Sequence, residues 1–266
     1  MGGMCGRFTL RASASVIAEQ FALFELPPFT ARFNIAPSQP VPVIRLQPEQ
    51  RESQRGCEKT GTGSVPTRTS HVEIASGTVP VPICSQPQRE LVWLQWGLIP
   101  SWAESPALGS RLINARAESA AEKPAFRTAL RRRRCLVVAD GFYEWQTVDG
   151  AKQPYFIHLR DDRPFAFAGM WEAWESPDHS MLETCTLITT EPNEVMRPIH
   201  NRMPVILSPD AYATWLNPAI QEPRRLASLL VPYSGNALQA HAVGSFVNTP
   251  SNDSPRCIEP VTGLFS

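Results

Sequence analysis

Five short segments of the chain place chemically capable side chains in apolar surroundings. Each supplies one or two of Cys, Asn, Arg, Glu or His, and each adjoins an expected strand end, where site residues often gather. A cysteine thiolate is a nucleophile, histidine and glutamate transfer protons, and arginine binds anions. The five segments are MCGRF (4–8), FNIAP (33–37), INARAES (113–119), DGFYEW (140–145) and IHNRMP (199–204).

These residue types permit the chemistry of a cysteine peptidase. Cys5 would be the nucleophile and His200 its base, with Glu144 or Asn114 orienting the imidazole. A nucleophile this near to the first residue of the sequence would be held by very little structure, and this weakens the hypothesis.

The same candidates have structural interpretations that need no reaction. Cys5 alone is typical of an inert small residue, and Glu144 would pair with Arg116. Asn114 would cap the helix that follows it, and His200 would be a turn residue bonded to the backbone.

Two further groups of residues have alternative interpretations. The run Arg131–Arg134 is either the solvated C-terminus of a helix, favoured by the helix dipole, or a patch that faces DNA. Four tryptophans are expected in the core rather than as platforms for bases: Trp93, Trp96, Trp145 and Trp171.

Composition excludes several classes of protein. The six cysteines form no C-x-x-C pair, so we expect neither a structural zinc site nor a disulfide framework, and no metal or cofactor. The formal net charge of +0 argues against a broad electrostatic binder, so any contact with nucleic acid would come from a local patch. No apolar run suits a signal peptide or a membrane helix, and we expect a soluble, cytoplasmic protein without a membrane partner.

The hydrophobic patterns predict many short strands joined by short helices. A first helix over 14–24 would place Ile17, Phe21 and Phe24 on one face, after a cap at Ser13. Residues 47–90 are rich in Ser, Thr, Gly, Gln and Pro, and we interpret them as a disordered insertion rather than as a linker between domains. The pattern favours an α+β fold with a curved, barrel-like sheet.

The motifs together resemble one family. Met-Cys-Gly-Arg-Phe, N-x-A-P, W-G-L-I-P-x-W, N-A-R-x-E, D-G-F-Y-E-W and H-x-R-M-P occur in order, as in the SOS-response-associated peptidase (SRAP) domain proteins, also called abasic-site processing proteins. The resemblance implies a single domain over residues 4–266, interrupted by the insertion. It also implies a mainly antiparallel sheet core with flanking helices, and a channel for single-stranded DNA.

The resemblance further implies a covalent reaction of Cys5 with abasic sites, as part of the response to DNA damage. An abasic deoxyribose opens to an aldehyde, and an N-terminal cysteine closes a five-membered thiazolidine ring on it. The α-amine has a pKa near 8, so about a tenth of it is neutral at pH 7 and able to form the intermediate imine. The thiol then adds within the same molecule. Such a stable crosslink protects the lesion.

The other motif residues take roles by the same resemblance. Glu144 would be the general acid and base, His200 would assist sugar opening or protonation, and Asn114 would orient the amine or the sugar hydroxyl. The candidates for contact with DNA are Arg7, Asn34, Pro37, Trp102, Arg116, Thr189 and Arg202, with Trp102 and Pro37 beside a base and the arginines on phosphates. We expect a monomer that joins the nucleoid when it is bound to DNA.

One departure from the family pattern concerns the N-terminus. Met1, Gly2, Gly3 and Met4 precede Cys5, and an amide nitrogen there cannot form the imine. We expect translation from Met4 followed by removal of that methionine, with self-processing of residues 1–4 as the alternative. A third class of function, a non-catalytic module that binds single-stranded nucleic acid, would need only the aromatic and arginine residues. Substitution of Cys5 by Ala distinguishes it, because binding would survive.

Overall fold

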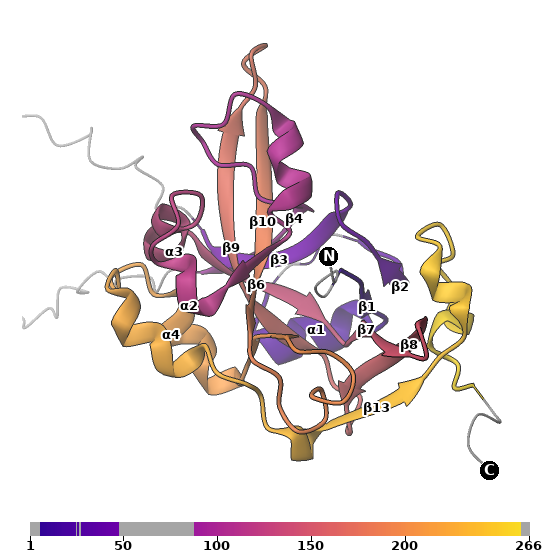
Figure 1. The fold of residues 1–266 in the computed structure, drawn as a ribbon. Coiled ribbons are helices and arrows are strands. Elements are labelled where there is room, and N and C mark those ends of the chain that lie inside the picture. The colour runs from indigo at the N-terminus through magenta and orange to yellow at the C-terminus, as the bar shows by residue number, and fades with distance from the viewer. Residues whose placement is uncertain (1–5, 25, 27, 48–87, 262–266) are drawn as a thin grey trace, which may run out of the picture.

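The centre of the protein is a closed barrel of five strands (Figure 1). The computed structural model describes residues 6–24, 26, 28–47 and 88–261. Around the barrel the order is β10, β4, β3, β6 and β9, and β9 pairs with β10 to close it. All of these pairs are antiparallel except β10 with β4, which is parallel. The barrel strands are β3 (Pro40–Leu46), β4 (Arg89–Trp96), β6 (Arg134–Ala139), β9 (Phe165–Glu175) and β10 (Met181–Thr190).

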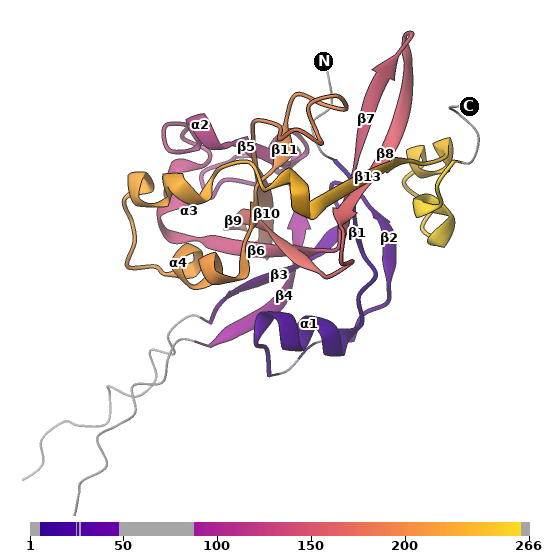
Figure 2. The ribbon, with the colours of Figure 1, turned by 90° about the horizontal axis from the view of Figure 1, so that it is seen from below.

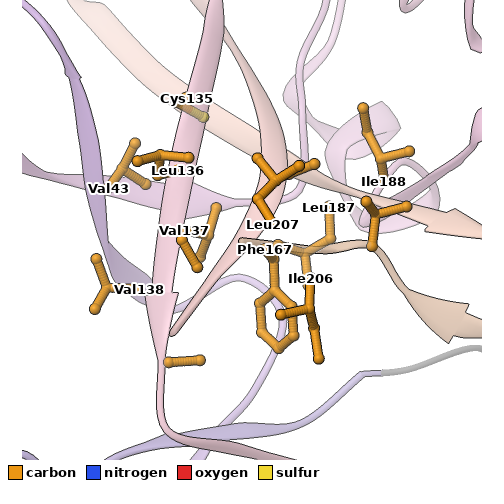
Figure 3. Packing of buried hydrophobic residues seen from close by; sticks show 14 of the residues in the cluster. Val43, Cys135, Leu136, Val137, Val138, Phe167, Leu187, Ile188, Ile206 and Leu207 are labelled. Atoms are coloured by element: carbon orange, nitrogen blue, oxygen red, sulfur yellow. The ribbon is translucent and has the colours of Figure 1, made fainter. Parts of the chain in front are cut away.

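The barrel is filled by apolar side chains. Every residue of β6 is buried, because α4 and β1 also pack against this strand. Figure 3 shows Val137, Phe167, Leu187 and Ile206 converging from four strands. Gly169 leaves room for this packing, since a Cβ there would lie 2.9 Å from Val137 Cγ2. A closed barrel also removes sheet edges that would otherwise need cover.

A second sheet of five antiparallel strands packs on the barrel. Phe8 joins the two, with its ring centroid 5.2 Å from that of Trp96 and 5.8 Å from that of Phe167. Asp140, between β6 and β7, accepts hydrogen bonds from Thr9 Oγ1 and from the Ala12 amide. The sheet order is β13 (Leu238–Ala242), β8 (Ala151–Leu159), β7 (Gly141–Val148), β1 (Phe8–Leu10) and β2 (Arg32–Ile35).

The helices are short and flank the sheets (Figure 2). The α-helices are α1 (Ala14–Phe21), α2 (Ala117–Ala120), α3 (Arg127–Arg132) and α4 (Tyr212–Leu216). The 3-10 helices are η1 (Pro106–Arg111), η2 (Pro209–Ala211), η3 (Pro223–Leu229), η4 (Gly235–Ala237), η5 (Ser245–Asn248) and η6 (Pro255–Ile258). Three further strands are β5 (Asn114–Arg116), β11 (Met203–Pro204) and β12 (Ile206–Leu207). The predicted α+β fold with a curved, mainly antiparallel, barrel-like sheet is confirmed.

The first helix is shorter than the sequence predicts. Ser13 is its N-cap, as expected, and accepts a hydrogen bond from the Val16 amide. Ile17 and Phe21 are buried, but Phe24 is 88% exposed. The helix ends because Ala22 adopts a left-handed conformation, with φ of 52°, and the chain turns away before Phe24.

The predicted insertion is also too long at its C-terminal end. Arg89 and Glu90 belong to β4, and the Gln47 amide donates to the Gln88 carbonyl at 2.9 Å, which extends the β3–β4 pairing. Polar strand ends resemble loop residues in composition, so the sequence pattern could not place this boundary. Residues 48–87 lie outside the described part of the chain.

Two of the four arginines in the run 131–134 have structural roles. Arg134 is buried and donates hydrogen bonds to the carbonyls of Leu130, Arg131, Trp215 and Asn217, where α3 and α4 end. Arg133 forms a 2.8 Å ion pair with Glu172 of β9. Only the first two members of the run are exposed, so a patch made of all four is excluded.

The tryptophans differ in their burial. Trp96 is fully buried in the core, as predicted. Trp93, Trp145 and Trp171 are only partly buried. Trp171 packs against the main core cluster and Trp145 against the second one, as predicted. The Arg45 guanidinium lies 4.5 Å from the centroid of the Trp171 ring.

Candidate active site

The end of β10 brings two predicted motifs together. Thr189 pairs with Arg116 of β5 on one side and with Pro204 of β11 on the other. β10 therefore lies between β5 and β11, and Figure 2 labels the three strands close together. Thr189 is fully buried, and its hydroxyl donates to the Ala115 carbonyl of β5 at 3.5 Å.

Arg202 is held from two directions just before β11. Its Nη1 and Nη2 donate to the two carboxylate oxygens of Glu118 in α2, at 2.7 and 2.9 Å. Nη2 also donates to the Thr189 carbonyl at 2.7 Å. The Arg202 hydrogen bonds lower the pKa of the Glu118 carboxyl, and the nearby charge of Arg116 adds to this effect. The Glu118 carboxyl is therefore ionised at neutral pH.

His200 lies in the loop that leads to Arg202. Its amide donates to the Met196 carbonyl at 2.8 Å, and Met196 is held in turn by Asn193 Oδ1. The imidazole Nδ1 is 3.2 Å from both the backbone nitrogen and the backbone oxygen of Arg202. An unprotonated Nδ1 can accept from that N–H, and a protonated Nδ1 can donate to that carbonyl. The backbone of Arg202 therefore holds the imidazole whether or not Nδ1 carries a proton. The interpretation of His200 as a turn residue bonded to the backbone requires the same contacts.

Glu144 faces His200 from β7. Strand alternation puts it on the same side as Phe142, which packs in the core, while Tyr143 and Trp145 point to the opposite face. Its carboxylate is 1% exposed, and Oε1 lies 3.9 Å from His200 Nδ1. The site therefore holds a buried acid beside an imidazole, and each of these groups can transfer protons.

The register of β1 places the start of the described chain at this acid. Phe8 pairs with Phe142, and the Tyr143 amide donates to the Arg7 carbonyl at 3.0 Å. Continuing that antiparallel register by one further step sets Gly6 opposite Glu144. Cys5 lies outside the described residues, but it is bonded to Gly6.

Comparison with known proteins gives the family. The sequence profile of the SOS response associated peptidase (SRAP) proteins matches residues 4–250. The chain belongs to the SRAP family. It is 40% identical to the abasic site processing protein YoqW of Bacillus subtilis (strain 168) over 260 residues, which cover 96% of this chain and 99% of that protein. It is 35% identical to the abasic site processing protein HMCES of Gallus gallus over 198 residues, or 65% of this chain and 58% of that protein.

Two crystal structures have the same fold. A protein from Bacteroides thetaiotaomicron has a TM-score of 0.61 at 31% identity, over 66% of this chain and 78% of that chain. A protein from Bordetella bronchiseptica has a TM-score of 0.68 over 90% of this chain and 100% of that chain. At 23% identity, the second likeness shows the fold alone.

Arg7 and Asn34 of this SRAP protein lie on the face of the second sheet that is opposite to Glu144. Arg7 Nη1 donates to Asn34 Oδ1 at 3.0 Å and to the Val247 carbonyl at 2.8 Å. The Asn34 amide donates to the carbonyls of Val247, Thr249 and Asn252, and the residue is fully buried. These bonds tie the C-terminal segment to β2 and to the residue before β1, which is a positioning role. The contact with DNA that we predicted for both residues stays a prediction.

Asn114 and Arg116 lie in β5. Asn114 is buried and pairs with Leu187 of β10. The N-cap of α2 is Arg116, so the interpretation of Asn114 as a helix cap is wrong. Asn114 is the first residue of β5, which separates it from the helix, and a cap must stand directly before the first turn. Arg116 is exposed.

Trp102 and Pro37 lie on loops outside this cluster. Trp102 follows β4, is 61% exposed, and lines a hollow of about 540 Å³ with Ala107, Leu108 and Arg111. Pro37 is in the turn between β2 and β3. An exposed indole beside a hollow is suited to stacking on a base, which leaves the prediction for Trp102 open to test.

One residue that the prediction passed over is Glu118. It is the last residue of the N-A-R-x-E motif, and its partner Arg202 is 84 residues away. Its place in the motif and its charge opposite to that of arginine could have marked Glu118 as a candidate, but neither identifies Arg202 as its partner. The structure shows that Glu118 joins α2 to the loop of His200 and Arg202.

The described cysteines are not accessible nucleophiles. Cys135, Cys185 and Cys257 are free thiols, and burial raises the pKa of each. Within the described ranges, no group of three or more His, Cys, Asp or Glu side chains is placed to hold a metal ion. None of the helices in that part of the chain is long and apolar enough to cross a membrane.

Proposed function

We propose that this SRAP protein captures abasic sites in single-stranded DNA by forming a thiazolidine crosslink through Cys5 as its N-terminal residue. The observation that carries the proposal is the buried Glu144–His200 pair, which stands across from Gly6, the residue bonded to Cys5. Relatives named abasic site processing proteins support the same substrate.

The reaction consumes an aldehyde and an aminothiol, and it releases one water. The neutral α-amine of Cys5 adds to the C1′ aldehyde of the opened sugar, and the carbinolamine loses water to give an imine. The imine keeps the proton on its nitrogen when water leaves, and the thiol sulfur then adds to the imine carbon as the thiol gives up its own proton. Attack within one residue is fast because the thiol and the imine are already held together. No oxidant or reductant is needed.

Glu144 and His200 divide the proton transfers. Glu144 in its protonated form donates to the carbinolamine hydroxyl, which leaves as water, and the carboxylate then takes the thiol proton. His200 helps to open the sugar, because a proton must move from the C1′ hydroxyl to the ring oxygen. No partner of His200 Nε2 is found among the described residues, so this nitrogen is the one we assign to the sugar. Asn114 would orient the amine from β5.

The DNA would be held by fewer residues than the motifs predict. Arg116 is the exposed arginine of the site, and Trp102 is the exposed aromatic. Arg7, Asn34, Thr189 and Arg202 would act by fixing the strands and loops around the lesion. We expect the protein to work as a monomer at the nucleoid.

Variants of Cys5 test the proposal. Cys5→Ala should form no stable adduct with an abasic oligonucleotide, yet bind intact single strands as the wild type does. Cys5→Ser keeps the amine, so its imine should be reversible and trapped by borohydride. A Cys5→Ala protein that still crosslinks would contradict the proposal. Cleavage of a peptide by the wild type with no DNA adduct would instead favour the peptidase that the family description names.

A further inference from the structure

We propose that Glu118 is a positioning residue for the abasic-site reaction, acting through Arg202 to hold the His200 imidazole beside Glu144. The inference rests on the proposed function for the reaction itself, but the contacts that carry it are independent of DNA. Glu118 would touch neither the sugar nor Cys5.

The first step is the attachment of Arg202. Its guanidinium makes a bidentate pair with Glu118, at 2.7 and 2.9 Å, and a third bond to the Thr189 carbonyl at 2.7 Å. Bidentate pairs fix orientation as well as distance. The Arg202 side chain is only 15% exposed, so water competes weakly for these bonds.

The second step is the link from Arg202 to the imidazole. The backbone nitrogen and oxygen of Arg202 each lie 3.2 Å from His200 Nδ1. These two groups determine which way the ring faces and which nitrogen carries its proton. A shift of the Arg202 backbone would therefore change both the tautomer of His200 and its distance from Glu144.

The third step is the charge of Glu118. Its side chain is 53% exposed, and the Arg202 hydrogen bonds lower the pKa of its carboxyl, so the carboxylate is present at neutral pH. Glu118→Gln keeps the shape of the side chain and one acceptor, but it loses the bidentate pair. The Arg202 guanidinium keeps the amide oxygen and the Thr189 carbonyl as acceptors, so the variant should fold.

A simpler alternative gives Glu118 a screening role only. Its charge would then neutralise Arg202 and weaken the attraction of the site for phosphates. Glu118→Gln would tighten binding of any single strand and leave the rate of adduct formation at saturating DNA unchanged. Glu122→Gln is the matched control, because Glu122 is an exposed acid four residues later, in the turn after α2, that carries the same charge.

A double-mutant cycle with His200→Ala separates these outcomes. At saturating abasic oligonucleotide, Glu118→Gln should slow adduct formation at least fivefold, while Glu122→Gln should react at the wild-type rate. In the His200→Ala background, Glu118→Gln should cause no further loss, since residues that act as a unit are not additive. An equal fractional loss in both backgrounds, or a wild-type rate for Glu118→Gln, would overturn the proposal.

A second measurement needs neither DNA nor the reaction. The ring nitrogen and carbon NMR shifts of His200 should report a changed tautomer balance in Glu118→Gln and an unchanged one in Glu122→Gln. Glu144, the nearest acid to the ring, is the same in all of these proteins. Unchanged His200 shifts in Glu118→Gln would reject the positioning role, even if the wild type formed no adduct. Changed shifts without an adduct would reject only the proposed function.

Discussion

Glu144 combines a charge-bearing side chain with an almost completely buried position. Its neighbours in β7 are Tyr143 and Trp145, which face away from it, and its Oε1 lies 3.9 Å from His200 Nδ1. A buried carboxylate is costly to keep ionised unless a partner stabilises its charge, and otherwise the group takes up a proton. Such sites are typical of groups that exchange protons during a reaction.

Glu144→Gln should therefore retain binding of single-stranded DNA but slow the formation of the crosslink by roughly a hundredfold or more, the usual range for lost acid–base help. The check is a time course of adduct formation at matched DNA occupancy. Gln146→Glu is not a suitable control, because Gln146 Nε2 donates to the Pro198 carbonyl of the His200 loop. The exposed change Thr147→Ala is a better one. A wild-type rate for Glu144→Gln would leave the proton transfers to His200.

Whether the role of a residue could be predicted from the sequence depended on the motif that contains it. Glu144 and His200 could be named from the sequence because their motifs occur in order. The partners of Arg202, Arg7 and Asn34 could not be named, since each side chain contacts residues far away in sequence. Residue type indicates that a guanidinium will bind an anion or a carbonyl, but only the fold decides between a phosphate and a carboxylate.

At the scale of elements, one buried arginine joins two helix ends. Arg134 begins β6, and its guanidinium caps the C-terminal carbonyls of α3 and α4. Burial lowers the pKa of Arg134 to about 10, which still leaves it charged at neutral pH. Helix C-termini carry carbonyls without intrahelical partners, so this contact replaces what water would otherwise supply.

Arg134→Met should destabilise the protein by roughly 2 to 4 kcal/mol, because several buried carbonyls would lose their donor. Arg132→Met, an exposed change two residues earlier, should alter stability by no more than about 0.5 kcal/mol. Urea unfolding measures both. Equal midpoints for the two variants would show that solvent satisfies these carbonyls.

Element boundaries were less predictable than element types. The strands of the barrel follow from their apolar runs, but closure of the barrel depends on the pairing of β9 with β10 and of β10 with β4. A parallel pair between strands so far apart in sequence has no local signal. The helix after Ser13 was predicted too long because the pattern continues to Phe24, while the backbone turns at Ala22.

At the scale of the whole molecule, the balance of charge limits how DNA is bound. The formal net charge is +0, and several arginines, among them Arg7 and Arg202 of the motifs, are paired within the protein. Arg116 is exposed and is the clearest candidate for a phosphate. Few phosphates should therefore be contacted.

The affinity for single strands should exceed that for duplex and should fall only gently with salt. With about 0.7 counterions released per phosphate on a single strand, two or three contacts give a log–log slope on the order of −2. Arg116→Ala should weaken binding regardless of sequence and make the slope shallower, whereas Arg132→Ala should not. A slope steeper than about −5, or equal affinity for duplex, would contradict a local DNA site.

The intact mass of the protein after incubation with an abasic oligonucleotide tests the central claim most directly. The proposal predicts a mature chain that begins at Cys5, and an adduct whose mass is that of protein plus oligonucleotide minus one water. Peptide mapping should place the modification on Cys5. A chain that still carries residues 1–4 and nevertheless crosslinks, or a modification mapped to any other residue, would contradict the thiazolidine mechanism.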